Sequence, residues 1–421
     1  MHRRRKMPNW AVPAIYAAIA IAAGVTIPKI EHILFPDLNT GLSIEASLAL
    51  LSSIGSGMIA LTGIVFSLAF VMMQFSATAY SPRLVMSVAR DPVLWHAVGI
   101  FSATFLYSIA AITMVNRYGK GTVPLLSIWI VILLLIASVG MFIALIDKLS
   151  LLQVNRMLEF TGDQGRACIG QIYPLKVEGD PDEPPLHFLG MDIGQLLRHE
   201  GAPCVIQAVD IDALLTIASA AQGVIVVATP IGDTLVEGTV MLRVYGAKSR
   251  IDDASLRLAF ATGNERTFEQ DPKYPIRLLV DIAIRALSPA VNDPTTAVQA
   301  LDQIEDLLRR LSCRSLGSGA YQDKQGEPRL FLPHPTWDDF LSLSFDEIRF
   351  CGASSVQVMR RMKALITDLI DSAPTERVAS LRKHDERLDA TIARAFVDPA
   401  DRASASLADR QGLGSPRQEL D

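Results

Sequence analysis

The clearest spacing in this chain belongs to a stripe of small and polar residues along one apolar stretch. Ser52, Ser56, Gly63, Ser67 and Gln74 follow one another at steps of four and seven, so a helix places them on one face. A membrane helix can use such a face to pack closely on another helix, to line a pore between subunits, or to line a substrate path inside one bundle. All three interpretations require that something other than lipid covers the stripe.

The stretch that carries the stripe, residues 47–75, contains no charged side chain. It is long enough to cross a hydrocarbon core of ~30 Å as a helix. Proton and ion relays commonly use Asp, Glu or Arg within the membrane, at a cost of at least ~2.5 kcal/mol each. The lack of charge therefore argues against a coupled transporter more than against a passive pore.

A second set of polar residues surrounds a predicted helix start at Asp293–Pro294, where Asp suits the N-cap and Pro the first helical position. Oxygen ligands and free backbone N–H groups at this point predict an ion- or anion-binding element, or a contact between subunits. The structural alternative is a helix–turn–helix corner with Arg266 in a salt bridge to a nearby acid and with Asp281 and Arg285 at the favourable spacing of four. The set comprises Arg266, Asp281, Arg285, Ser288, Asn292, Asp293, Thr295 and Thr296.

Composition and motifs exclude several classes of function. A net charge of -5 argues against nucleic acid as a partner. The four cysteines and seven histidines show no metal-ligand spacing, and the cysteines are interpreted as reduced thiols of a cytoplasmic compartment. The sequence contains no HExxH, phosphate-loop, GxSxG or dinucleotide motif. We therefore expect no enzyme, no metal and no cofactor.

The elements that must position these residues begin with a membrane domain over residues 1–150. The fold class that we predict is an α-helical bundle of four transmembrane helices followed by a cytoplasmic α+β region. The four apolar stretches lie at residues 9–27, 47–75, 94–115 and 123–146. Most basic residues that flank them, including the cluster at 3–6, fall on one side, and the positive-inside rule then places both termini in the cytoplasm.

The cytoplasmic half is predicted to begin with a helical stalk at 151–164 and a small β domain at 165–249. Runs at 166–173, 202–209 and 224–230 have the composition of strands, with a helix at 210–222 capped by Asp210 or Asp212. Residues 230–244 predict a hairpin that resembles those of lipoyl- and biotinyl-type barrel-sandwich domains. Those domains carry a modified lysine at the hairpin tip, and this segment has no lysine, so the resemblance implies a fold and no cofactor.

A helical domain at 250–397 and a mobile tail at 398–421 complete the predicted organisation. The tail is polar and rich in Ala, Ser and Gly. Helices are predicted at 251–262, 273–288, 294–312, 336–350, 354–371 and 375–396.

Three segments carry a family resemblance: QFSATAYSPRL at 74–84, RTFEQDP at 266–272 and DIAIRALSPAVNDPTTAVQALD at 281–302. They resemble a family of bacterial predicted membrane proteins with a domain of unknown function, over nearly the whole chain up to about residue 370. The resemblance implies a bacterial inner-membrane protein with four spans and a cytoplasmic C-terminal half. It implies no catalytic residue.

The functional hypothesis is a homo-oligomeric, channel-like inner-membrane protein that passes ions or small solutes and carries a cytoplasmic regulatory ring. The alternative is a non-conducting sensor or scaffold whose cytoplasmic half binds a protein or a small ligand. In the first case the stripe lines the path; in the second it only packs helices.

Overall fold

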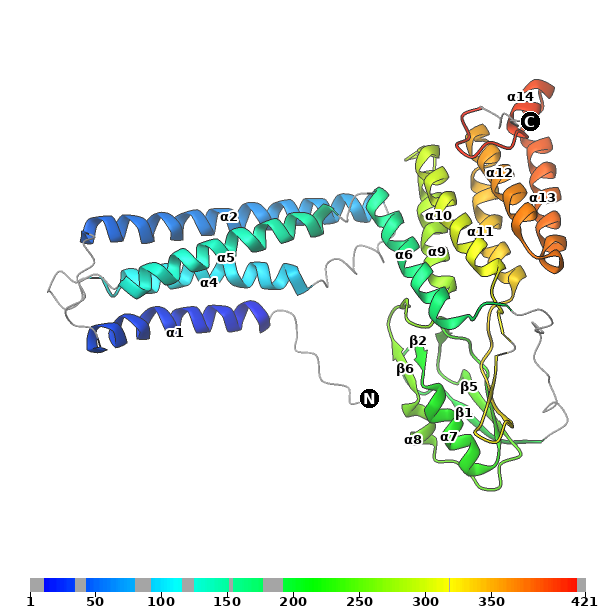
Figure 1. Cartoon of the computed structure of the whole chain (residues 1–421), viewed down its shortest axis with the longest axis horizontal. Helices are drawn as coiled ribbons and strands as arrows, with labels where there is room; N and C mark the ends of the chain where they lie inside the picture. Colours follow the sequence, from blue (N-terminus) through cyan, green and yellow to red (C-terminus); the bar gives the residue numbers. More distant parts are fainter. Residues whose placement is uncertain are drawn as a thin grey trace. The chain divides into compact units, whose positions relative to one another are not determined.

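The computed structural model describes residues 11–34, 43–79, 92–115, 125–150, 154–176, 192–317 and 319–414. The chain divides into two compact units, Met1–Met157 and Leu158–Asp421, which are described separately (Figure 1). The predicted turn at 116–122 and the basic residues at 3–6, 83 and 90 that suggested the orientation lie outside the described residues.

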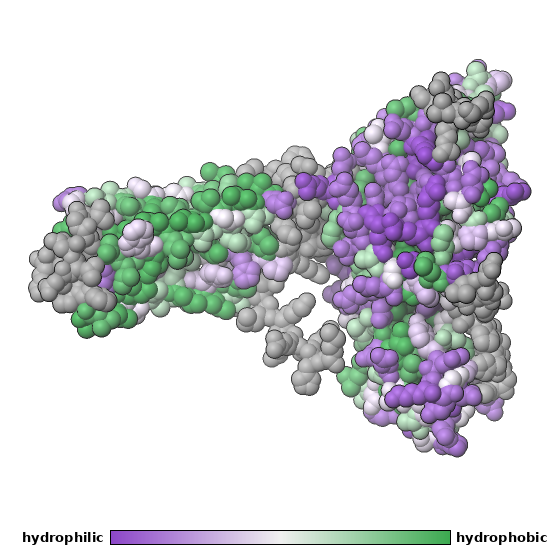
Figure 2. All heavy atoms as spheres, viewed as in Figure 1, coloured by the Kyte–Doolittle hydropathy of each residue, from purple (hydrophilic) through white to green (hydrophobic). Residues whose placement is uncertain are grey.

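The first unit confirms the four predicted spans. Each of its helices is long and apolar enough to cross a membrane, and Figure 2 shows its hydrophobic surface. The helices are α1 (Ala11–Leu34), α2 (Ile44–Ala79), α4 (Pro92–Ile112) and α5 (Leu125–Ser150). The first helix continues through Pro28, where we expected it to end. This continuation brings Glu31 to the start of α5, whose Leu126 N–H donates to both carboxylate oxygens at 3.1 Å.

Helix α4 is the centre of this bundle, because α1, α2 and α5 all pack against it. Phe101 and Tyr107 are buried in its faces, and Gly24 of α1 lies so close that an added Cβ would be 2.7 Å from the Ala110 Cβ. Polar contacts join α4 to α5: Thr104 Oγ1 lies 3.0 Å from Ser138 Oγ and 3.4 Å from the Leu134 carbonyl oxygen, and the Tyr107 hydroxyl donates to Ser127 Oγ at 3.3 Å. These buried hydroxyls are therefore satisfied within the bundle.

The second unit contains two sheets. The five-stranded sheet has the order β1-β5-β3-β8-β7, in which only β3 and β8 pair in parallel; the three-stranded antiparallel sheet has the order β4-β2-β6. A core of buried aliphatic side chains, including Leu197, Ile206 and Leu242, packs with α7. The elements are β1 (Ile193–Arg198), β2 (Cys204–Val209), α7 (Ile211–Ala221), β3 (Val224–Val227), β4 (Thr234–Leu235), β5 (Val240–Tyr245), α8 (Asp253–Leu258), β6 (Phe260–Gly263), β7 (Ala320–Gln322) and β8 (Pro328–Phe331).

A helical layer forms the rest of this unit, beginning with α6 (Val154–Ile172). The other helices are α9 (Lys273–Ala286), α10 (Pro294–Ser312), α11 (Trp337–Cys351), α12 (Val356–Ser372), α13 (Thr375–Ala395) and α14 (Pro399–Ala405). Two buried arginines tie them together. Arg361 of α12 pairs with Asp302 and Glu305 of α10, and Arg377 of α13 donates to the Leu311 and Arg314 carbonyl oxygens.

Most helices predicted for the C-terminal half of the chain are confirmed, and so is the Asp210 cap of α7. Four expectations are wrong. The run 166–173 is not a strand, because α6 continues to Ile172; its buried residues recur with helical spacing. Residues 230–244 form no hairpin, since β4 pairs with β2 and β5 pairs with β1 and β3 in the other sheet.

The remaining two errors concern the boundaries of predicted elements and domains. Residues 251–262 form the short helix α8 and the strand β6, and three strands (β6, β7 and β8) lie beyond the expected end of the β domain at 249. Residues 399–414, expected to be a mobile tail, contain α14 and pack on α12: Arg360 donates to the Ser404 carbonyl at 2.7 Å and Arg410 to Asp368 at 2.7 Å.

Candidate functional site

The structure places the predicted stripe on the outward surface of α2. Ser52, Ser56, Gly63, Ser67 and Gln74 are all exposed in the single chain. A β-carbon at Gly63 would meet no atom of the surrounding chain within 4 Å. The opposite face of α2 carries the buried residues that pack into the bundle, namely Leu51, Gly55, Met58 and Val65.

The serine hydroxyls of the stripe have no hydrogen-bond partner among the residues that the structure describes. By contrast, Thr62 on the same helix donates to the Met58 carbonyl oxygen at 2.6 Å. Large apolar side chains flank the stripe, and Ile59 and Phe66 are 52% and 65% exposed. The outward face of α2 is thus a polar line between apolar side chains, and its hydroxyls are free to bond to a group outside the chain.

This placement removes one of the three interpretations of the stripe. A substrate path inside a single four-helix unit would require these side chains to face the bundle interior, which they do not. Fully buried Leu51, Phe101 and Val131 occupy that interior instead. Close packing on a second subunit and the lining of a pore between subunits both remain.

The second set of predicted residues forms the corner between α9 and α10. Asp293 caps α10: its carboxylate accepts from the Thr296 N–H at 3.1 Å and from the Thr296 hydroxyl at 2.6 Å. Asn292 adopts a left-handed φ of 48°, and the Asn292 N–H donates to the Ser288 carbonyl at 2.9 Å. Asn292 and Thr295 are exposed at the turn. The local bonds therefore realise the structural alternative, a helix–turn–helix corner.

The charged residues before this corner pair within the unit. Asp281 does not pair with Arg285, as its spacing predicted; it accepts instead from Arg277, which also binds Glu347 of α11. Through Glu347, Arg277 joins α9 to α11, whereas a salt bridge between Asp281 and Arg285 would have stayed within α9. Arg266 forms the predicted salt bridge, with two hydrogen bonds to buried Asp271 at 2.6 and 2.8 Å.

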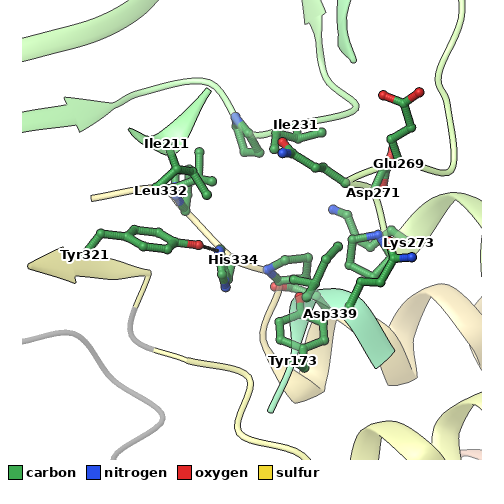
Figure 3. A pocket seen from close by; sticks show the side chains of 17 residues that line it. Tyr173, Ile211, Ile231, Glu269, Asp271, Lys273, Tyr321, Leu332, His334 and Asp339 are labelled. Carbon is green, nitrogen blue, oxygen red and sulfur yellow. Dashed lines mark hydrogen bonds between the residues drawn. The ribbon is translucent and has the colours of Figure 1, made fainter. Parts of the chain in front are cut away.

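A cavity of about 610 Å³ lies in the second unit, between the strands and the helices (Figure 3). Its walls combine prolines and aliphatic side chains with two tyrosines, one histidine, one lysine, two glutamines and three carboxylates. The lining side chains come from α6 and the residue after it, from the start of α7, from the loop before β4, from residues 269–273 at the start of α9, and from β7, the segment after β8 and the start of α11. Those used below are Tyr173, Glu269, Asp271, Lys273, Tyr321, His334 and Asp339.

The aromatic polar groups of the cavity differ in their bonding. His334 Nδ1 lies 3.2 Å from the Leu316 carbonyl oxygen and therefore carries the proton, so Nε2 accepts from the Tyr321 hydroxyl at 3.3 Å. Burial lowers the pKa of His334, which keeps the imidazole neutral at pH 7. Tyr173 is 1% exposed, and its hydroxyl oxygen has no hydrogen-bond partner in the part of the chain that the structure describes.

Sequence reasoning did not find the cavity. Its tyrosines, histidine and lysine lie up to 161 residues apart along the chain, from Tyr173 to His334, and none belongs to a motif. Tyr173 was assigned to a strand, and the strands that position Tyr321 and His334 were not predicted. The prolines at 333 and 335 are the one local signal that a shaped, irregular segment passes here.

Comparison with known proteins places the chain among membrane proteins. A family model described as "Predicted membrane protein (DUF2254)" matches residues 7–368. An uncharacterized protein of Mycobacterium bovis and uncharacterized proteins of two Mycobacterium tuberculosis strains are each 27% identical over 414 residues, which cover 94% of this chain and 78% of each relative. No solved structure matches.

Proposed function

Because the chain belongs to this family of predicted membrane proteins, we propose that it is a homo-oligomeric, channel-like protein in which α2 of each subunit lines or closes a path for ions or small solutes. The observation that carries the proposal is the outward stripe of α2. Four apolar helices and a packed bundle account for membrane insertion, but among the described residues they give the three serines of the stripe no hydrogen-bond partner.

Contact with protein or water is energetically more favourable for the stripe than contact with lipid. A hydroxyl without a partner in hydrocarbon costs free energy, of order 1–3 kcal/mol on protein-derived scales. Three such serines on one line, with Gly63 among them, match the small-residue faces that let membrane helices approach closely. A pore satisfies the same hydroxyls with water. Both solutions need a second copy of α2 or another subunit next to the first.

Water access along α2 tests the proposal directly. Single cysteines would replace Ser56 on the stripe and Ile59 beside it, in a background with Cys313 and Cys351 changed to serine. A membrane-impermeant thiol reagent applied to reconstituted protein should modify Ser56→Cys many times faster than Ile59→Cys, and flux in liposomes should fall with the extent of modification. No modification of Ser56→Cys, or modification without any flux to block, would overturn the pore.

Orientation and location belong to the same proposal. The basic residues on one side of the spans favour cytoplasmic termini, and a bacterial inner membrane with the second unit on its cytoplasmic side fits this orientation. In that arrangement the second units form a ring of domains beneath the membrane.

A second candidate function is a non-conducting sensor or scaffold. The cavity of the second unit favours it, because a cytoplasmic pocket of this volume has the size of small-molecule sites. In that case Ser56→Leu should leave the response to the ligand unchanged, whereas substitutions in the cavity should abolish it.

A further inference from the structure

The polar groups that line the cavity of the second unit differ in whether they have a hydrogen-bond partner within the chain. Its acidic groups are largely occupied or peripheral: both Asp271 oxygens accept from Arg266, one Asp339 oxygen accepts from the Thr336 N–H and hydroxyl at 2.8 Å, and Glu269 is exposed at the rim. Among the described residues, Glu269 and the second Asp339 oxygen accept no hydrogen bond, and two donors, the Lys273 ammonium and the Tyr173 hydroxyl, have no acceptor.

Lys273 is the first of these donors. It lines the cavity, and its ammonium makes no hydrogen bond or ion pair with any residue that the structure describes. Lys273 also opens α9, a helix of 14 residues whose N-cap, Pro272, supplies no side-chain hydrogen bond. The positive end of the helix dipole and the ammonium therefore act at the same wall, and both favour a negative charge.

The Tyr173 hydroxyl is the second donor, and it provides evidence independent of the helix end. The side chain is 1% exposed, and its oxygen has no hydrogen-bond partner among the residues that the structure describes, which is unfavourable for a buried hydroxyl. Burial raises the pKa of Tyr173, and the nearby Cys168, Tyr321 and Asp271 raise it further, so the group stays protonated and can donate. Two of those neighbours, Tyr321 and Asp271, are themselves cavity walls.

The remaining wall is apolar. Ile211, Ile231 and Leu332 contribute its aliphatic side chains, and in Figure 3 the Tyr321 hydroxyl lies beside His334, to which it donates at 3.3 Å. Four prolines complete the lining, at 230, 272, 333 and 335. Such a wall accepts a planar or aliphatic body, and the donors fix one charged end of it.

We propose that this cavity binds a small organic anion, a carboxylate or phosphate carried on a flat apolar body, with the anionic group at Lys273 and Tyr173. The inference does not rest on conduction, and it supplies the sensor candidate with a site and a ligand class. A cation is not favoured, because both Asp271 oxygens and one Asp339 oxygen are already bonded, Glu269 lies at the rim, and the Lys273 ammonium would repel it. A bare inorganic anion would leave the apolar wall empty.

The test is equilibrium binding to the purified full chain in lipid nanodiscs. The probes are benzoate and phenyl phosphate, with benzamide as the neutral analogue of benzoate and inorganic phosphate as the anion without a body. At least one aromatic anion should bind at least tenfold more tightly than benzamide and than inorganic phosphate. The comparison of benzoate with phenyl phosphate decides between carboxylate and phosphate.

Three variants assign the binding to the cavity. Lys273→Gln should weaken the aromatic anion at least tenfold and remove its advantage over benzamide, while Lys248→Gln, at an exposed lysine outside the cavity, should change nothing. Tyr173→Phe should weaken binding several-fold yet leave the melting temperature of the ligand-free protein unchanged or higher, because the hydroxyl it removes has no partner.

Three results would overturn the proposal: no saturable binding of either aromatic anion, benzamide binding as tightly as benzoate and phenyl phosphate, or full affinity in Lys273→Gln. A lower melting temperature in ligand-free Tyr173→Phe would show that the hydroxyl already has a structural partner, and would remove the second donor from the argument. Solute flux is measured separately, on the same protein reconstituted in liposomes, and none of these binding outcomes decides it, so the two proposals fail separately.

Discussion

The same substitution at two glycines of the membrane unit separates packing within the chain from contacts beyond it. Leucine at Gly24 places a Cβ 2.7 Å from the Ala110 Cβ and 3.2 Å from the Tyr107 carbonyl oxygen, so α1 and α4 must move apart. Overpacking of this kind costs about 1–3 kcal/mol or more. Leucine at Gly63 meets no neighbour within 4 Å, so its cost within one chain should stay within about 0.5 kcal/mol.

Any larger effect of Gly63→Leu must therefore arise outside the single chain. If α2 packs on a second subunit, a cost of about 1–3 kcal/mol per contact lowers the association constant about 5- to 150-fold, and the oligomer dissociates on dilution. If α2 lines a pore, the oligomer stays intact and the added side chain narrows the path. Gly24→Leu should instead lower the melting temperature, whatever the oligomeric state.

The assay combines three measurements on each variant: melting temperature, mass in detergent by light scattering as a function of dilution, and solute flux in liposomes. Gly63→Ala serves as the control, since a methyl group keeps the surface small. Should Gly63→Leu change neither mass nor flux, the stripe faces lipid, and the role given to α2 here is wrong. Should it lower the melting temperature as much as Gly24→Leu does, Gly63 is packed within the chain and the outward placement is wrong.

The remaining predictions concern the second unit. Asp293→Ala should destabilise it by about 1 kcal/mol through loss of the α10 cap, whereas Asp293→Asn should retain most of that stability in thermal melts; equal losses would argue for a charge-dependent role. Burial raises the pKa of the Cys168 thiol to about 12, so at pH 8 it should react with maleimide at least about a hundredfold more slowly than exposed Cys313, and comparable rates would contradict its environment. Labelling of Cys313 by an impermeant reagent in intact cells would refute the predicted orientation. Burial lowers the pKa of His384 below 6.5, so the unfolded state binds more protons in acid, and unfolding midpoints in denaturant should fall from about pH 6.5 downward; in His384→Gln this part of the decline should disappear.

Elements with local signals could be predicted from the sequence. Pro294 after Asp293 fixed the start of α10, and the structure has the helix beginning there with the expected side-chain cap. The capping of α7 by Asp210 follows the same logic. The four spans rest on length and hydropathy alone, and these needed no knowledge of neighbours.

Elements that depend on distant partners could not be predicted. The stalk was predicted to end at 164, but α6 continues to Ile172, and its glycines are sites of close approach. Added β-carbons at Gly162 and Gly165 would lie 2.1 Å from Gln303 Oε1 and 2.8 Å from a Leu307 methyl carbon of α10. No residue near 162 in the sequence indicates that α10 will pack against this part of α6. For the same reason β4 and β5, which look like a hairpin, separate into two sheets, and β3 finds its parallel partner β8 about a hundred residues later.

The membrane unit shows why periodicity alone left the function open. It holds two sets of hydroxyl side chains of similar composition. Thr104, Ser108, Ser127 and Ser138 are buried and bonded between or along α4 and α5, whereas the serines of the α2 stripe are exposed and unbonded in the described chain. The spacing of the residues shows that each set lies on one helix face. Only the packed structure shows which of the two faces already contacts another helix of the same chain. Since the buried set already supplies the polar contacts that specify the four-helix bundle, the α2 set is not needed for folding one chain. Its occupant must therefore be sought in the assembled protein, as water or as a second subunit.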